Sequence, residues 1–320
     1  MSNLPSRGPA CSGRGDVPVD PTDLSDPVVL AVDVGGTKMA AAVVDPSGTI
    51  VADGRIATPI TSDPEEVFGA LVALIEQVRS TTTMEPVMCG VGCGGPMTAG
   101  GAMVSPLNIG AWVRFPLRDR LSESLGLAVA VDNDAKALAL GEGWLGAARD
   151  SANYMAMVVS TGVGGGIVVD GHLLDGEDGN AGHIGHVVVV PEGRPCACGG
   201  RGCLEAEASG LSIQQFTGRP AAEAPEEVRR RTGLLVGRAV ASMSNLLDVE
   251  LTVVAGSVAL GFGAPFFDAA QAELSSRSRL DFSRLARIIP GGLGAHGPLV
   301  GAASVGRRAY VASTLTTGTR

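Results

Sequence analysis

The sequence has no excess of positive charge, and this lack narrows the range of possible partners. It contains 24 Lys and Arg residues against 33 Asp and Glu residues, which gives a formal net charge of -9 at pH 7, and its pI is near 5.0. Nucleic acids and anionic membranes are bound through basic patches. The composition therefore argues against a nucleic acid or a membrane as partner, and any phosphate group must be held by a local site.

Hydrophobic runs long enough to cross a membrane are also missing, and so is an export signal. A membrane-spanning helix needs about 20 consecutive apolar residues, and the first residues lack the charged-then-apolar order of a signal peptide. We therefore expect a cytoplasmic protein with reduced cysteines. A chain of 320 residues with 45% hydrophobic content can bury two moderate cores, so two domains are expected.

Two common nucleotide-binding fingerprints are absent as well. None of the glycine-rich segments shows the dinucleotide-binding pattern with its trailing helix, and none is a P-loop. The sequence therefore disfavours both a Rossmann dehydrogenase and a P-loop NTPase.

Cysteine is scarce outside one short segment. Cys11, Cys89 and Cys93 are scattered along the chain. We expect Cys11 to be a thiol in an N-terminal tail and the other two to be small core residues. A disulfide is not expected in a cytoplasmic protein.

The other three cysteines form a cluster that follows His186. Cys196, Cys198 and Cys203 lie in one glycine-rich loop. One imidazole and three thiolates are a complete donor set for tetrahedral zinc, and disulfides between cysteines so close in sequence would be strained. We therefore predict a structural Zn²⁺ site over residues 186–205. The alternative is a surface loop with incidental thiols, which the clustering disfavours.

Two segments share a plan of strand, glycine-rich turn and strand. In the first, the β-branched strand 28–32 leads into the turn 33–37 and a further strand. In the second, the strand 154–160 leads into the turn 161–165 and the strand 166–169. A repeated plan of this kind indicates an internal duplication. With the helices predicted around it, the pattern favours an α/β protein of two lobes.

Helices are expected where apolar residues recur at helical spacing. One begins at Pro64 and one follows Pro298. A third follows the strand 127–131, and either Asn133 or Asp134 occupies its N-cap position. A functional site at this junction of strand and helix is plausible.

The glycine turns have a physical use. Consecutive glycines allow several backbone N–H groups to point into one concavity, which suits phosphate oxygens. Thr37 and Thr161 add hydroxyl donors, and Asp33 can hold Mg²⁺ through water. An ordinary tight hairpin explains either turn alone, but two turns with the same plan favour a binding role.

These motifs, taken in order, resemble those of the ROK family of bacterial sugar kinases and repressors. The resemblance extends from about Val28 to the C-terminus and implies an actin-like (ribonuclease H-like) kinase fold. It also implies ATP with Mg²⁺ and a hexose as bound partners, and a homodimer or homotetramer. The segments that carry it are Asp33–Lys38, Asn133–Asp134, Thr161–Gly166, Gly185–His186 and the cysteine loop that ends at Glu205.

The resemblance also implies roles for single residues. Asp134 matches the general base that accepts the proton of the sugar hydroxyl, a role compatible with a helix cap. The positions that match ATP and phosphate binding are Asp33, Gly35, Gly36, Thr37, Lys38, Thr161, Gly162, Gly164, Gly165 and Gly256. The positions assigned to sugar binding are Gly95, Asn108, Asn133, Asp134, His183, His186 and Glu205.

One position departs from the pattern of the sugar-phosphorylating members. A glutamate is usual three residues before the zinc histidine, and this chain has His183 there. The change replaces an anionic acceptor for sugar hydroxyls with an imidazole, so it bears on the choice of sugar. Lys136, where an asparagine is frequent, is a smaller departure.

The expected organisation has three parts. Residues 1–27 form a disordered leader, too short for the DNA-binding domain of the repressors. A smaller lobe spans 28–132 and is joined by the helix 298–313, and a larger lobe spans 133–297. We expect phosphorylation of a hexose or an N-acetylhexosamine at O6.

Three alternatives stay open at this point. A sugar-binding sensor or scaffold that has lost catalysis would explain His183. A kinase of the acetate or glycerol type has the same superfold but no need for the cysteine loop. Polyphosphate could replace ATP as the donor, although the acidic balance favours ATP.

Two further side-chain sets have simple interpretations. Arg229–Arg231 is expected to be the solvated face of a helix rather than a nucleic-acid patch. Trp112 either stacks on a sugar or anchors a loop, and the second is favoured.

Overall fold

Two five-stranded sheets form the frame of the protein. The structure is a computed structural model, and it describes residues 26–317. The first sheet has the strand order β3-β2-β1-β4-β5 and the second β10-β9-β6-β7-β8. The strands of the first are β1 Val29–Val34, β2 Lys38–Val44, β3 Ile50–Ala57, β4 Met88–Cys93 and β5 Ala128–Asn133. Those of the second are β6 Tyr154–Val159, β7 Val163–Val169, β8 His172–Leu173, β9 Leu251–Ala255 and β10 Arg287–Pro290.

The two sheets have the same topology. In each, the central strand (β1 or β6) is antiparallel to the strand that follows it, and parallel to a strand much later in the chain (β4 or β9). A third strand continues the antiparallel side and a fifth the parallel side. The repeated plan seen in the sequence is therefore confirmed, and it covers whole sheets rather than single hairpins.

The helices occupy both sides of this frame. The prediction of a helix from Pro64 is confirmed: Asp63 caps it by accepting from the N–H of Glu65, and its buried face includes Val67, Leu71 and Ile75. The helices are α1 Pro64–Arg79, α2 Leu117–Leu125, α3 Asp134–Trp144, α4 Leu204–Ala208, α5 Gly210–Thr217, α6 Glu226–Leu247, α7 Ser257–Phe262, α8 Ala264–Arg277 and α9 Gly297–Thr317.

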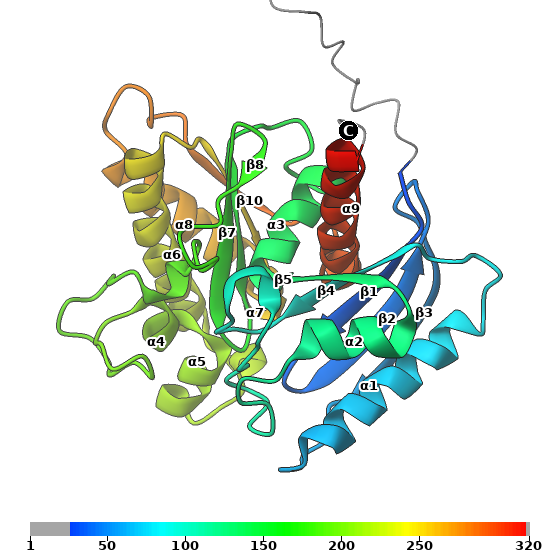
Figure 1. The fold of residues 1–320 in the computed structure, drawn as a ribbon. Coiled ribbons are helices and arrows are strands. Elements are labelled where there is room, and N and C mark those ends of the chain that lie inside the picture. The colour runs from blue at the N-terminus through cyan, green and yellow to red at the C-terminus, as the bar shows by residue number, and fades with distance from the viewer. Residues whose placement is uncertain (1–25, 318–320) are drawn as a thin grey trace, which may run out of the picture.

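Helices α3 and α9 lie side by side between the two sheets (Figure 1). A Cβ atom on Gly141 of α3 would lie 3.0 Å from the Cα atom of Gly301 of α9, so only glycine permits this close approach of the two helices. Helix α9 also packs on β1 and β4, whereas α3 contacts β4 of the first sheet and both β6 and β7 of the second. Helix α3 therefore connects the two halves of the molecule.

Each sheet has its own hydrophobic core. The core of the first sheet includes α1 and Trp112, which is 1% exposed, stacks on Phe115 and donates from its ring nitrogen to the carbonyl of Pro64. Trp112 is therefore a loop anchor, as favoured. The core of the second sheet includes α6 and α8.

The start of the described chain is tied to helix α9 by an ion pair. The expected leader lies outside the described residues except for Asp26 and Pro27, and Asp26 forms an ion pair with Arg307 of α9. The boundary between 132 and 133 stays a prediction, and it falls where β5 passes into α3. Within residues 26–317, every helix is too short or too polar to span a lipid bilayer.

Candidate active site

The acidic residues singled out in the sequence lie at one edge of the first sheet. Asp33 is near the end of β1, and it pairs in register with Gly92 of β4, which pairs with Asp132 of β5. Asp134 follows β5 directly as the first residue of α3. Because β1, β4 and β5 are parallel, their carboxyl ends meet at the same edge, where sites of open α/β sheets form.

Asp33 is held in an environment that disfavours its charge. It is 9% exposed. Burial, and then the nearby charge of Asp134, raise the pKa of Asp33 to about 7, while Lys38 acts in the opposite direction. A buried carboxyl group with a second carboxyl beside it can lower its energy by acquiring a cation.

The side chain of Asp134 is open to solvent, but the protein around it disfavours its charged form. Asn133 caps α3 by accepting from the N–H groups of Ala135 and Lys136, which settles the question of the cap. The side chain of Asp134 is exposed to solvent, yet the protein atoms around it raise the pKa of its carboxyl. The N–H of Ala135 also donates to one of its oxygens at 2.9 Å. A raised pKa brings a carboxylate nearer to the range in which a general base works at neutral pH.

The first turn of α3 packs on both sheets, and on the second sheet glycines make room for it. In β4, a Cβ atom on Gly92 would lie 3.7 Å from the Cα atom of Asp134. In β7, a Cβ atom on Gly164 would lie 2.8 Å from that of Ala135, and one on Gly166 would lie 3.0 Å from the Cα atom of Lys136. Asp134 is therefore placed where the two sheets meet.

This packing corrects one expectation from the sequence. Gly164 and Gly165 were expected in the second glycine turn, but they belong to β7, because the ladder with β6 already closes at Val159 and Val163. The turn consists of residues 160–162. The two glycines instead make room for neighbours: Ala135 of α3 lies over Gly164 and Ile184 over Gly165.

The first glycine turn leaves two successive N–H groups without a partner. The N–H of Gly35 closes the turn by donating to the carbonyl of Lys38 at 3.1 Å, and Thr58 binds the carbonyls of Gly35 and Thr37. Among the described residues, nothing accepts from the N–H groups of Gly36 and Thr37. This is the arrangement that suits a phosphate oxygen.

The second turn has the same property. The N–H of Ser160 donates to the carbonyl of Gly162 at 2.9 Å, and no acceptor in the described part of the chain takes the N–H groups of Thr161 and Gly162. Gly256, at the end of β9, lies against the backbone of Val159, and the hydroxyls of Ser160 and Ser257 are 2.9 Å apart. The predicted nucleotide positions of the second sheet are therefore adjacent.

The expected sugar positions of the first half surround Gly36. Asn108 packs directly on Gly36, so closely that a Cβ atom there would collide with it. Its loop is tied back by the N–H of Leu107, which donates to the carbonyl of Gly95 at 3.3 Å. A Cβ atom on Gly95 would in turn lie 3.6 Å from the side-chain nitrogen of Asn133. The structure thus links Asn108, Gly95 and Asn133 in one group.

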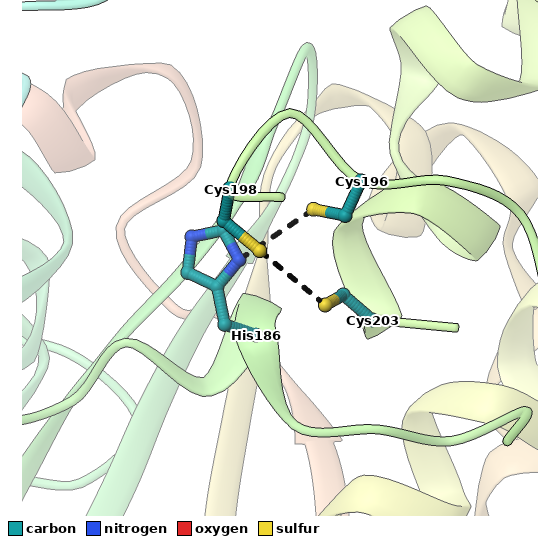
Figure 2. Close-up of side chains that lie close together, drawn as sticks. All are labelled: His186, Cys196, Cys198 and Cys203. Carbon is teal, nitrogen blue, oxygen red and sulfur yellow. Dashed lines mark hydrogen bonds between the residues drawn. The ribbon is translucent and has the colours of Figure 1, made fainter. Parts of the chain in front are cut away.

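The cysteine loop folds into a set of converging donors. In Figure 2 the side chains of His186, Cys196, Cys198 and Cys203 point toward one another. Their ligand atoms all lie within 4.8 Å of one another. The sulfur atoms of Cys198 and Cys203 are 3.7 Å apart, and the sulfur of Cys196 is 3.7 Å from Nδ1 of His186.

These distances fit a tetrahedral zinc site. Zn–S bonds of about 2.3 Å at tetrahedral angles place two sulfur atoms about 3.8 Å apart, close to the separation of Cys198 and Cys203. The same separation excludes a disulfide, whose sulfur atoms lie about 2.05 Å apart. The donor set and its spacing therefore suit Zn²⁺, with Nδ1 of His186 on the metal side and Nε2 on the other.

Glu205 connects the cysteine loop to the second turn. It lies in α4, whose N-cap is Cys203. The N–H of Val163, at the start of β7, donates to a Glu205 oxygen at 3.0 Å. The same oxygen lies 2.9 Å from the position of a Cβ atom on Gly162. Glu205 therefore lies between the end of the cysteine loop and the turn at Gly162.

His183 stands among the other candidate groups. Its ring lies 6.0 Å from that of His186. Burial, followed by the charge of His186, lowers the pKa of His183, while the carboxylates of Glu205 and Asp134 raise it. The charges of Asp134 in α3 and Glu205 in α4 therefore both act on His183, in the segment before Ile184.

An ion-pair cluster around the buried carboxylate of Glu207 was not predicted from the sequence. Glu207 is 1% exposed and forms 2.5 Å ion pairs with Arg194, in the cysteine loop, and Arg231, in α6. Arg229–Arg231 was expected on a solvated helix face, which holds for Arg230 at 57% exposed, whereas Arg231 is 38% exposed and binds Glu207 of α4. The only sequence signal was an acidic residue close after Cys203.

The sequence matches a known family over most of its length. The sequence model of the ROK family matches residues 29–309. The chain is 34% identical over 252 residues to an N-acetylmannosamine kinase of Escherichia coli O6:H1, covering 74% of this chain and 85% of that protein. It is 36% identical over 255 residues to a glucokinase of Halalkalibacterium halodurans, covering 75% and 76% of the two chains.

Solved structures give the same result for the fold. A ROK family glucokinase from Streptomyces griseus, crystallised with glucose and AMPPNP, superposes with a TM-score of 0.77 at 29% identity. The match covers 88% of this chain and 99% of that one. The expected actin-like fold is therefore confirmed.

Proposed function

The chain belongs to the ROK family, and from that premise we propose that it transfers the γ-phosphoryl group of ATP to a hydroxyl group of a hexose or an N-acetylhexosamine. The observation that carries the proposal is the position of Asp134. It begins the helix that packs on both sheets, and in each sheet the central strand leads into a turn with two successive free N–H groups. Relatives named as kinases of N-acetylmannosamine and of glucose support the substrate class.

The proposed chemistry is mainly positioning and charge stabilisation. The N–H groups of Gly36, Thr37, Thr161 and Gly162 hold phosphate oxygens, and Lys38 adds a positive charge. Asp33 would hold, through water, the Mg²⁺ that accompanies ATP, and the cation would relieve the repulsion from the carboxyl group of Asp134. Asp134 accepts the proton as the sugar oxygen attacks, most often O6 in this proposal.

The proposed sugar site lies between the two halves. Asn108, Gly95 and Asn133 line it from the first half, and His183, His186 and Glu205 line it from the second. Zinc would hold the cysteine loop in shape. The Nδ1 atom of His186 would then be fixed, which leaves Nε2 oriented toward a sugar hydroxyl.

The test is ADP release from ATP and Mg²⁺ with glucose, mannose, fructose, allose, N-acetylglucosamine and N-acetylmannosamine. A His183→Glu variant is measured beside the natural chain. Sugar-dependent turnover by the natural chain supports the proposal and identifies the sugar. If the natural chain is silent and the variant active, His183 has converted the site to sugar sensing without catalysis. Silence of both chains contradicts phosphorylation.

A further inference from the structure

The departure at Lys136 has a clear structural role. This side chain is 3% exposed, and it extends from α3 only two residues after Asp134. Its ammonium group lies 2.7 Å from an oxygen of Asp175, 3.2 Å from one of Asp132 and 3.1 Å from the carbonyl of Gly179. An ammonium group has three N–H donors, so these acceptors match its capacity.

Two of these acceptors lie in the loop that carries His183. The loop follows β8 and spans residues 174–183. Asp175 is near its start, where its carbonyl accepts from the N–H of Ala181 at 3.0 Å. Gly179 is four residues before His183. Lys136 therefore contacts the loop at two points, and His183 is the last residue of that loop.

One side of this loop borders a cavity, whereas Gly182 at its end packs on the backbone of Gly165 in β7. A cavity of about 330 Å³ lies beside it, and its lining includes Thr98, Asp132, Lys136, Asp175 and Arg308. Gly176, Gly179 and Gly182 all have positive φ angles, a backbone conformation that side-chain-free residues adopt easily. On the cavity side, the contacts from Lys136 to Asp175 and Gly179 are therefore the ones that restrict the loop.

We propose that Lys136 is a positioning residue of the sugar site. By binding Asp175 and Gly179 it fixes the 174–183 loop, and the fixed loop presents His183 to the sugar. This inference rests on the proposed function for the identity of the ligand. It predicts an effect on sugar binding that leaves phosphate transfer and ATP binding nearly unchanged.

The first experiment replaces Lys136 with Met, which keeps the length of the side chain and removes the charge. Sugar affinity is measured by calorimetry, and KM and kcat by ADP release. We expect the sugar Kd and KM to rise about tenfold, with kcat and the KM for ATP within about threefold of the natural chain. An unchanged sugar affinity overturns the proposal.

A double-mutant cycle tests whether the effect passes through His183. Lys136→Met is introduced into the natural chain and into a His183→Ala variant. Because the loop acts through His183, the first substitution should weaken sugar binding about tenfold in the natural chain and less than about twofold in the variant. Equal losses in both backgrounds, or no loss from His183→Ala alone, contradict the proposal.

Two further variants provide a second test of the loop contact and a control for it. Asp175→Asn removes the main contact from the exposed side of the loop and should reproduce the rise in sugar Kd even if Lys136→Met does not fold. Arg308→Met removes the other partner of Asp175, 3.0 Å away in α9, and leaves Lys136 in place. It should change sugar affinity by less than about twofold, and a loss as large as that of Asp175→Asn would overturn the assignment to Lys136.

The outcomes also separate this inference from the proposed function. Binding is measured without turnover, so the cycle can be read for any sugar that binds. Absence of sugar phosphorylation with a normal cycle refutes the kinase and leaves the positioning role. Normal phosphorylation with an unchanged Lys136→Met variant refutes the positioning role alone, and a chain that binds no sugar refutes both.

Discussion

The two sheets share one topology, but they hold their glycine turns in different ways. In the first, the turn after β1 packs on the backbone and side chain of Asn108, in a loop tied to Gly95. In the second, the turn after β6 packs on Glu205, at the end of the cysteine loop. The duplicated frame provides matching N–H groups, whereas most of the side chains that we assign to the sugar come from the segments inserted into it.

This difference suggests that both halves bind phosphate, whereas the loops of the second half select the sugar. The free N–H pairs of Gly36 with Thr37 and Thr161 with Gly162 are alike, and we assign both to phosphate. His183, His186 and Glu205 lie in the segment that runs from β8 through α4, outside the ten strands of the two sheets. Substitutions in the frame should therefore affect transfer, and substitutions in the cysteine loop and the 174–183 loop should affect the sugar.

The largest expected effect comes from Asp134, which begins the helix that packs on both sheets. Asp134→Asn should lower kcat by about 10²–10⁴-fold, the usual contribution of a general base, because an amide cannot accept the proton. Sugar affinity, measured by calorimetry, should stay within about threefold. Full activity of the variant would remove Asp134 from the mechanism.

A substitution in the cysteine loop should weaken sugar binding and leave nucleotide binding unchanged. Cys198→Ser should lose bound zinc and, since His186 is then no longer held, weaken sugar binding by about 10–100-fold. The affinity for an ATP analogue should not change. Zinc content and the two affinities are the measurements, and Cys89→Ala, in β4 outside the loop, is the control. Metal-free protein with normal sugar affinity would break the proposed link.

The same substitution in the two turns should give unequal effects. A Cβ atom on Gly36 would collide with the backbone and Cβ atom of Asn108, so Gly36→Ala should cost about 1–3 kcal/mol of stability as well as activity. On Gly162 it would lie 2.9 Å from a Glu205 oxygen, at the movable end of a side chain. Gly162→Ala should therefore cost less. Equal losses of unfolding free energy in the two variants would contradict this difference in packing between the two turns.

The smallest expected effect is a pH dependence of the first half. The pKa of Asp33 is raised from 3.8 to about 7, so the folded protein binds more protons than the unfolded chain between these values. Its contribution to stability falls as the pH rises through that window. Without Mg²⁺, Asp33→Asn should raise Tm by at least about 2 °C at pH 8, and the gain should vanish near pH 4. A gain that is equal at both pH values would contradict the assignment.

Much of the frame could be predicted from the sequence, because strand and helix periods are local signals. The turn at Gly35 and Gly36 and the helix from Pro64 were expected. Gly164 and Gly165 were misplaced because a glycine in a strand and one in a turn look alike until the strand pairing is known. The metal donors could be found because their spacing is short.

Contacts between distant segments could not be predicted in this way. The burial of Lys136 depends on Asp175, far away in the chain, and that of Glu207 depends on Arg231 in another helix. A lysine or an arginine in a sequence is more often solvated than buried. Only the three-dimensional structure shows which of them are held by carboxylates.

The central claim is that both halves act on one transfer of phosphate from ATP to a sugar. Its most direct test measures the ADP and the sugar phosphate formed in the same reaction, with the sugar that gives the fastest turnover. The account predicts one sugar phosphate per ADP, with both rates falling together in Asp134→Asn. ADP formed without sugar phosphate would contradict it, since the protein would then be hydrolysing ATP.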